Sequence, residues 1–378
     1  MTRRSFKHRI VRATQPFRRR EPVQTEISAS KAMLRVGGRE WFVESDRELP
    51  PFQTYDFAAW IAGALSLRRG QPMRLDLPVS EGTALSLART SALWTARMPM
   101  DCHPMDVELT NVVPDPPRPE HGGILCLSGG VDSTFAAIEA CRNNRYSHAV
   151  LLHGMDIHYD DKVSFSGRRA RVARIAEHFR LDLIVVRTNI PKSFRPGKSY
   201  LPLLLNCVLH YAGNGLASGA FAADNTPAYG LMIAPEANIL GVESYFQSPA
   251  FGIDYFGWAS TRAEKLAAIY AEAPGLLADL TVCAEYNVSG GNCGVCEKCM
   301  RNRLSLEIAG LDQKLMFPDR RDAVAFYETF TSSDPVLGLL GLLQTEQLAM
   351  AMPDGDDRQK LLAQAADLRK RYFGHRAP

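Results

Sequence analysis

Residues 124–134 read Ile-Leu-Cys-Leu-Ser-Gly-Gly-Val-Asp-Ser-Thr, and this stretch decides the fold of the chain. An apolar strand runs into two glycines, and an apolar helix beginning near Phe135 follows at once. Glycines let the backbone turn sharply and approach an anion closely, and the first turn of a helix adds unpaired N–H donors and the positive end of its dipole. The stretch therefore predicts a phosphate-binding turn. The alternative is an ordinary glycine turn between a strand and a helix.

The side chains of this turn fit phosphate chemistry. Serine and threonine hydroxyls can donate hydrogen bonds to phosphate oxygens, and the carboxylate of Asp132 can hold the Mg²⁺ that accompanies a nucleotide. The lysine of a Walker P-loop is absent from this position. The residues expected to bind the nucleotide are Ser128, Gly129, Gly130, Val131, Asp132 and Ser133.

Strand-like and helix-like segments alternate from residue 123 onward. The apolar pattern predicts strands at 124–127, 149–153, 183–186 and 231–234, and helices ending near Arg142, over 168–180 and over about 201–218. Such alternation is typical of an α/β fold with a doubly wound parallel sheet, whose ligands bind at the carboxyl ends of the strands. The loops at 128–134, 154–161 and 235–245 are therefore candidates. Their acidic and polar side chains are either functional or simply solvated, and they include Asp156, His158, Asp160, Asp161, Glu236, Asn238 and Glu243.

Four of the eight cysteines lie close together in the sequence. Cys283 precedes the run Cys293-Gly-Val-Cys296-Glu-Lys-Cys299, whose two overlapping C-x-x-C units supply three more thiolates. Four thiolates suit tetrahedral Zn²⁺ and leave no open position for water, so we expect a structural zinc knuckle over 283–299. An iron–sulfur cluster uses the same ligands and is the alternative to zinc that the spacing leaves open.

A helix is expected to begin after Ser260-Thr261, because either hydroxyl can cap it with Glu264 completing a capping box. Arg262 and Lys265 fall on adjacent turns of this helix. They can reach phosphates, or they can form an ordinary exposed basic face.

Taken in order, these features resemble the 7-cyano-7-deazaguanine synthases, a family within the N-type ATP pyrophosphatase superfamily. The resemblance covers about residues 122–312 and includes the loop at 128–133, Lys265, the four clustered cysteines, Arg301 or Arg303, and Gly310-Leu-Asp312. It implies adenylation of a carboxylate by ATP with release of pyrophosphate, followed by attack of ammonia or an amine. It also implies Mg²⁺ and structural Zn²⁺ as cofactors. By position, the catalytic residues would be Ser128, Asp132, Ser133 and Lys265.

The chain also departs from this family. The loop after the second strand reads His153-Gly-Met-Asp156 rather than the usual Asp-Tyr-Gly-Gln, and the stretch at 235–262 lacks the synthase signature. Adenylation is therefore better supported than a deazaguanine substrate. The open alternatives are ligation of a deazaguanine-type acid to a protein or peptide amine, a tRNA-modifying enzyme of the thiolation type, and a non-catalytic nucleotide-binding scaffold.

The remaining segments suggest added parts around this domain. Residues 1–20 carry eight Lys/Arg and no acidic residue, so 1–25 is expected to be a solvated, disordered basic arm. Residues 26–113 predict a small α/β or α+β accessory domain, with a hairpin at Gly37-Gly38, that can present a protein acceptor. Four prolines within 114–119 predict a stiff linker over 114–121. A helical C-terminal extension is expected over 313–378.

Composition limits the remaining function classes. The net charge is +3, and removing the eight basic residues of the arm from the 44 Lys/Arg leaves 36 against 41 acidic residues. Nucleic-acid binding is therefore only weakly supported. No apolar run is long enough to span a bilayer, and the N-terminus lacks a secretory signal, so we expect a cytoplasmic protein without a membrane partner. The sequence leaves a homodimer open.

Overall fold

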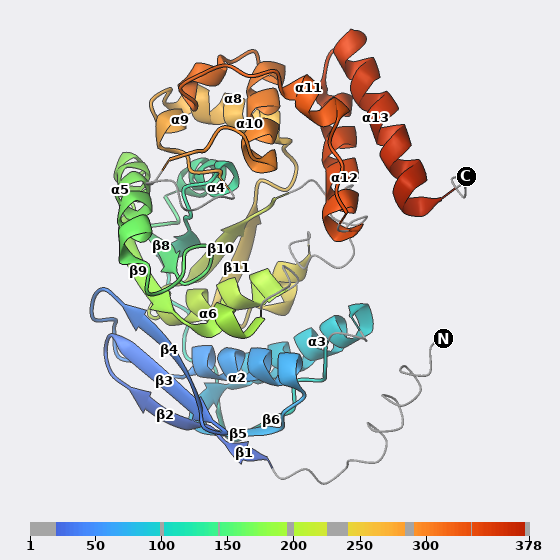
Figure 1. Ribbon diagram of the computed structural model, residues 1–378. Helices are drawn as coiled ribbons and strands as arrows, with labels where there is room; N and C mark the ends of the chain where they lie inside the picture. Colours follow the sequence, from blue (N-terminus) through green and yellow to red (C-terminus); the bar gives the residue numbers. More distant parts are fainter. Residues whose placement is uncertain are drawn as a thin grey trace.

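The computed structural model describes residues 20–98, 102–142, 144–194, 200–224, 241–283, 291–333 and 335–374. Its centre is an eight-stranded sheet in the order β11-β10-β7-β8-β9-β4-β3-β2 (Figure 1). The strands from β11 to β9 are parallel, whereas β4, β3 and β2 continue the sheet in antiparallel pairs. In chain order the eight strands are β2 (Gln24–Ile27), β3 (Lys31–Val36), β4 (Arg39–Ser45), β7 (Gly123–Cys126), β8 (His148–His153), β9 (Asp182–Thr188), β10 (Ser218–Ala222) and β11 (Gly252–Phe256).

Helices cover both faces of this sheet, so the molecule is a mixed α/β structure with a parallel sheet, as expected. Side chains alternate along β7, and Ile124 packs in the core on one face while Leu125 packs in the core on the other. One face carries α4 (Val131–Cys141), α5 (Lys162–His178) and the helices α8 (Arg262–Glu272), α9 (Leu276–Asp279) and α10 (Glu297–Ile308). The opposite face carries α6 (Leu201–Ala212), as Figure 1 shows.

The strand that follows α6 corrects the sequence-based assignment. The helix ends at Ala212 rather than near 218, and β10 begins at Ser218 inside the stretch assigned to helix. β11 was not predicted, and the strand predicted at 231–234 lies outside the described residues. β10 reads Ser-Gly-Ala-Phe-Ala, which has little intrinsic strand preference. Close packing selects it, because a Cβ on Gly219 would lie 3.1 Å from side-chain atoms of Leu209 and Phe251.

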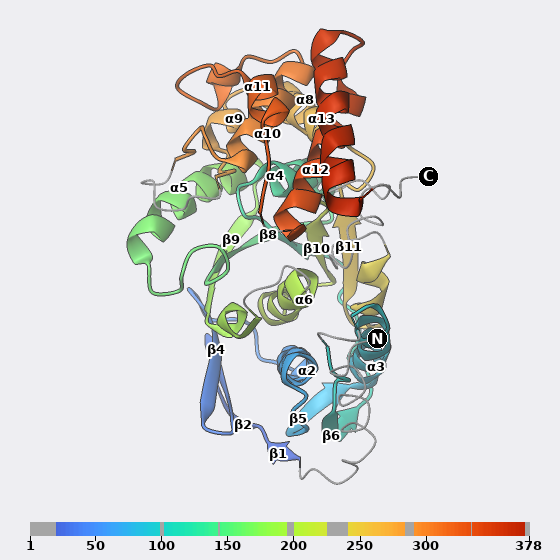
Figure 2. The same cartoon turned by 45° about the vertical axis from the view of Figure 1, so that its right-hand side comes forward.

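The N-terminal segment shares the main sheet. The hairpin predicted at Gly37-Gly38 is present, and β4 pairs with β9 so that Val43 lies opposite Thr188. Helix α2 (Asp56–Arg69) packs on α6, with a small sheet of β1 (Glu21–Pro22), β5 (Met73–Ser80) and β6 (Val107–Val113) beyond it (Figure 2). Residues from 26–113 and from 122–312 thus share one core. The division into two domains stays a prediction.

Helices α3 (Glu81–Arg97), α11 (Ala323–Glu328), α12 (Pro335–Ala351) and α13 (Asp356–Phe373) complete the described elements. The last three form the C-terminal extension, which packs against α10 through a core that includes Leu304, Tyr327 and Leu348. Among the residues that the structure describes, no helix is both long and apolar enough to cross a membrane.

Candidate functional site

The loop that joins β7 to α4 is a tight turn at the carboxyl end of the strand. Gly129 has a φ of +77°, which glycine adopts readily, and a Cβ there would lie 2.8 Å from Cγ2 of Val172. Gly130 is the N-cap of α4. The backbone N–H of Ser128 donates to Oγ of Ser133 at 3.2 Å, and the two hydroxyl oxygens lie 3.1 Å apart. These contacts between Ser128 and Ser133 hold the two ends of the turn together, and the turn leads directly into the first N–H groups of α4.

Asp132 lies in the first turn of α4 and pairs with two cations. Nζ of Lys265 lies 2.8 Å from Oδ1 of Asp132, and Nη2 of Arg262 lies 2.9 Å from Oδ2. Lys265 also donates to the carbonyl of Ala223 at 2.6 Å. Burial alone would raise the pKa of Asp132, but the opposing charges of Arg262, Lys265 and Arg301 hold it below its usual value. The carboxylate is therefore ionised and fixed.

Helix α8 directs both of its cations inward. Thr261 caps the helix, and Glu264 completes the predicted capping box. Only 1% of the Lys265 side chain and 15% of the Arg262 side chain are exposed, so the alternative of an exposed basic face is wrong.

Arg301 from α10 is the third cation near Asp132. Burial works against its charge, yet nearby Glu297, Tyr327 and Asp132 together raise the pKa of the guanidinium. Its Nε is buried and has no hydrogen-bond partner among the described residues. The sequence offered Arg301 and Arg303 as equivalent candidates for the site. In the structure, of these two only Arg301 is among the charges that act on Asp132.

Arg303 has a structural role. Its side chain is fully buried, stacks 4.1 Å above the ring of Phe317, and donates to Gly294, Gln313 and Asp319. It joins the cysteine turn to the segment that leads to the C-terminal helices.

The four clustered cysteines come together. The ligand atoms of Cys283, Cys293, Cys296 and Cys299 all lie within 4.8 Å of one another. The sulfurs of Cys283 and Cys296 are 3.9 Å apart, and those of Cys293 and Cys299 are 3.8 Å apart. A tetrahedral ion with Zn–S bonds of about 2.3 Å requires sulfurs about 3.8 Å apart, so the cluster fits Zn²⁺. The four cysteines therefore form, at the predicted positions, a cluster that could hold a metal ion.

The cysteine cluster borders the phosphate loop directly. The backbone N–H of Thr281, two residues before Cys283, donates to the carbonyl of Gly129 at 2.8 Å. Asn292 then holds this segment from the other side, because its side chain bonds both Leu280 and Val282. The metal site and the loop are thus neighbours through one short piece of backbone.

The other two candidate loops, at 154–161 and 235–245, show mainly local contacts among their described residues. Asp156 pairs with Arg168 at 3.0 Å, and buried His153 stacks on Phe165 with ring centroids 4.0 Å apart. Glu243 accepts a hydrogen bond from the N–H of Gly241, which is a local turn contact. Glu236 and Asn238 lie outside the described residues.

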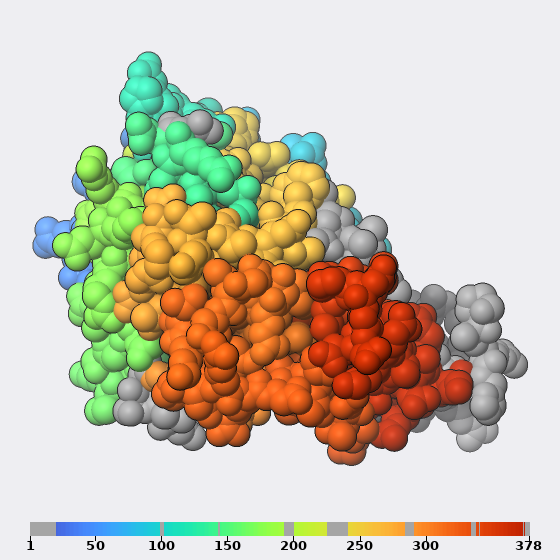
Figure 3. Space-filling view, turned by 90° about the horizontal axis from the view of Figure 1, so that it is seen from above, coloured from blue at the N-terminus to red at the C-terminus, as the bar shows by residue number. Residues whose placement is uncertain are grey.

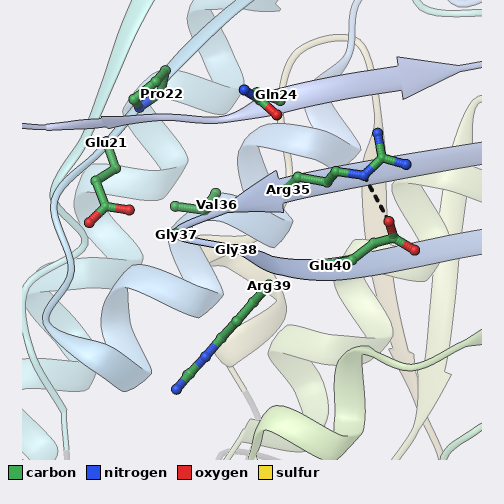
Figure 4. A pocket seen from close by; sticks show the side chains of 9 residues that line it. All are labelled: Glu21, Pro22, Gln24, Arg35, Val36, Gly37, Gly38, Arg39 and Glu40. Carbon is green, nitrogen blue, oxygen red and sulfur yellow. Dashed lines mark hydrogen bonds and ion pairs between the residues drawn. The ribbon is translucent and has the colours of Figure 1, made fainter.

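A cavity of about 430 Å³ lies elsewhere, at the β3–β4 hairpin (Figure 4). Its lining includes Glu21, Gly37, Gly38 and the Arg35–Glu40 pair. Arg35 is half exposed and already paired with Glu26 as well, and no residue of the 128–133 loop lines this cavity. The cavity therefore lacks the convergent charges of the loop.

The structure thus gathers Asp132, Lys265, Arg262 and Arg301 around one glycine turn and places a four-cysteine site beside it. Compared with known proteins, the chain matches no family model and no curated protein.

Proposed function

We propose that this chain is an ATP-dependent adenylating enzyme that cleaves ATP between the α and β phosphates. The observation that carries the proposal is the convergence of Arg262, Lys265 and Arg301 on the turn that opens α4. Three cations face one loop carboxylate there, and the N–H groups of the helix start add positive potential. We propose a polyphosphate as the ligand, because its oxygens can accept hydrogen bonds from these cationic side chains and from the N–H groups of the helix start.

The proposed reaction is the one that the resemblance to the synthases implies. A carboxylate oxygen of the acid substrate attacks the α phosphorus, the bond from that phosphorus to the bridging oxygen breaks, and pyrophosphate leaves. The fixed cations stabilise the negative charge that builds up on the leaving group, and Mg²⁺ bound with the nucleotide supplies further charge. The nitrogen of ammonia or an amine then attacks the acyl carbon, AMP leaves, and the nitrogen loses a proton.

Asp132 acts in this proposal by holding cations. Because its two oxygens already face Lys265 and Arg262, the carboxylate orients both side chains toward the loop. Ser128 and Ser133 offer hydroxyls within the turn. The four-cysteine site keeps α10 and the Thr281 contact in place, so its Zn²⁺ is structural.

The acid is proposed to be a 7-deazaguanine carboxylate, on the resemblance of residues 122–312 to the synthases. The product is an amide where ammonia attacks, or a conjugate where a protein amine does. A nitrile forms where a second ATP adenylates the amide oxygen, which then leaves with AMP as the amide nitrogen loses its protons. Thiolation is less well supported, because it needs a reactive cysteine. Burial raises the pKa of Cys126 to about 12 and also raises the pKa of Cys207. Burial and the charge of Glu272 raise the pKa of half-buried Cys141, so none of these three thiols ionises readily at neutral pH.

The test is the set of products formed from ATP. Purified protein with Mg²⁺, ATP and 7-carboxy-7-deazaguanine is expected to release pyrophosphate only when the acid is present, and to release AMP once a nitrogen nucleophile attacks the acyl adenylate. Ammonium or a candidate protein acceptor is then added, and mass spectrometry identifies the product. Arg262→Met should abolish release, whereas Arg145→Met, at an exposed ion pair with Asp254, should not.

Release of ADP and orthophosphate would refute cleavage at the α–β bond. Tight ATP binding without turnover across a panel of acids would instead support the scaffold alternative.

A further inference from the structure

The C-terminal extension touches the phosphate site through Tyr327 of α11. This side chain is fully buried, and its hydroxyl donates to Oε1 of Glu297 at 2.8 Å. Glu297 is the first residue of α10 and directly follows Cys296. In Figure 3 the orange part of the chain, to which α10 and α11 belong, lies between the red C-terminal segment and the golden segment of α8 and α9. The extension therefore packs against the helix that carries Arg301.

The oxygen of Glu297 that accepts this hydrogen bond also faces Arg301. Nε of Arg301 lies 3.8 Å from the same Oε1, one helical turn further along α10. An arginine side chain has many rotamers, and ordering it costs conformational entropy. Tyr327 holds one oxygen of the Glu297 carboxylate in place, so this carboxylate is a fixed counter-charge for the guanidinium. The fixed charge reduces the number of rotamers that the Arg301 side chain populates.

Arg301 also interacts with acidic groups outside the extension. The charge of Arg301 acts on Asp132, and Asp224, which follows β10, acts on Arg301. Arg301 is thus coupled electrostatically both to Glu297, which contacts the extension, and to Asp132 of the loop.

We propose that Tyr327 is a positioning residue of the nucleotide site, which orients Arg301 toward the phosphate loop through Glu297. The C-terminal helices are then part of the ATP-binding machinery. This inference rests on the proposed function, because Arg301 needs a phosphate ligand to act on.

A double-mutant cycle on the full chain tests the inference. Isothermal titration with ATP and Mg²⁺ compares wild type, Tyr327→Phe, Arg301→Met and the double variant. Because residues in one hydrogen-bond network are energetically coupled, Tyr327→Phe should weaken ATP binding roughly fivefold. In the Arg301→Met background the same change should have no further effect. Zinc content and the melting temperature are measured in parallel.

Two further variants sharpen the cycle. Glu297→Gln keeps an oxygen that can accept from Tyr327 but removes the charge that faces Arg301, so it should lose as much affinity as Tyr327→Phe. Tyr372→Phe is the matched control, because it removes another tyrosine hydroxyl of the extension, one that donates to Ser332. Tyr372→Phe should leave ATP binding at the wild-type value.

The outcomes separate the two proposals. If wild type binds ATP and Tyr327→Phe binds it equally well, or loses as much in the Arg301→Met background as alone, Tyr327 does not act through Arg301 and only this inference fails. If wild type binds no ATP, the proposed function fails, and the inference fails with it.

Discussion

Nζ of Lys265 lies 2.8 Å from Oδ1 of Asp132 and joins two residues that are 133 positions apart in the chain. The contact ties α8 to the start of α4. It is shielded from water, since only 1% of the lysine side chain is exposed. A buried ammonium without its carboxylate is costly, so each member of the pair requires the other in the folded protein.

Asp132→Asn should destabilise the protein strongly. The substitution keeps the shape of the side chain but leaves the buried charge of Lys265 without a counter-charge, which typically costs about 3–5 kcal/mol. Urea unfolding followed by tryptophan fluorescence measures the loss of unfolding free energy. Asp312→Asn is the control, because Asp312 pairs with exposed Arg320 and its loss should be far smaller. Equal losses in the two variants would contradict a buried, stabilising pair.

The same pair predicts a pH dependence. The pKa of Asp132 is lower in the folded protein than its ordinary unfolded value of about 3.9. Stability from this group is therefore fully present above about pH 4 and is lost as the pH falls through the folded pKa, because the unfolded chain binds the proton more readily. Urea unfolding from pH 6 to pH 3 should show a steeper decline for wild type than for Asp132→Asn. Parallel curves would exclude Asp132 as a source of acid sensitivity.

Metal analysis should find one zinc ion per chain. Replacing one of four thiolate ligands weakens the site, so Cys296→Ser should lose zinc and unfold at a lower urea concentration. Cys141→Ser, which changes a half-buried cysteine outside the cluster, should retain the metal. Loss of zinc should also weaken ATP binding, because Thr281 holds Gly129 next to the cluster. Iron with visible absorption in place of zinc would assign the site to an iron–sulfur cluster.

A fragment covering 114–378 should fail to fold by itself. Removing the N-terminal segment leaves the edge of β9 unpaired and exposes the face of α6 that α2 covers. We expect aggregation or molten behaviour in size-exclusion chromatography and near-UV circular dichroism. The predicted arm of 1–25 is too long, because strands β1 and β2 begin at Glu21 and Gln24. A fragment covering 20–378, which lacks only residues 1–19, is therefore the control and should behave as the full chain. A monomeric, cooperative 114–378 fragment would establish it as an independent domain.

Local signals in the sequence were sufficient for much of the site. Glycines, a helix start and cysteine spacing each act over a few residues, so the glycine turn at 128–133 and the four-cysteine cluster could be located in advance. The capping box at Thr261 is equally local. The direction in which Arg262 and Lys265 point could not be read, because periodicity places both on adjacent turns without saying what faces them.

Long-range packing explains what the sequence did not show. β10 is composed mainly of small residues, and its strand conformation depends on the fit of Gly219 against Leu209 and Phe251. The pairing of β4 with β9 joins residues more than 140 positions apart, and no nearby residue signals it. The role of Arg301 likewise depends on Tyr327, which the sequence places in a separate helical tail.

Lys265 also limits how a ligand can be held. An ammonium group has three N–H bonds, and two of them point to Asp132 and to the carbonyl of Ala223. A single N–H is left, in a direction fixed by the other two. Lys265 can therefore donate a hydrogen bond to only one oxygen of a bound anion. Every other hydrogen bond to that anion must come from guanidinium groups, hydroxyls or the backbone of the turn.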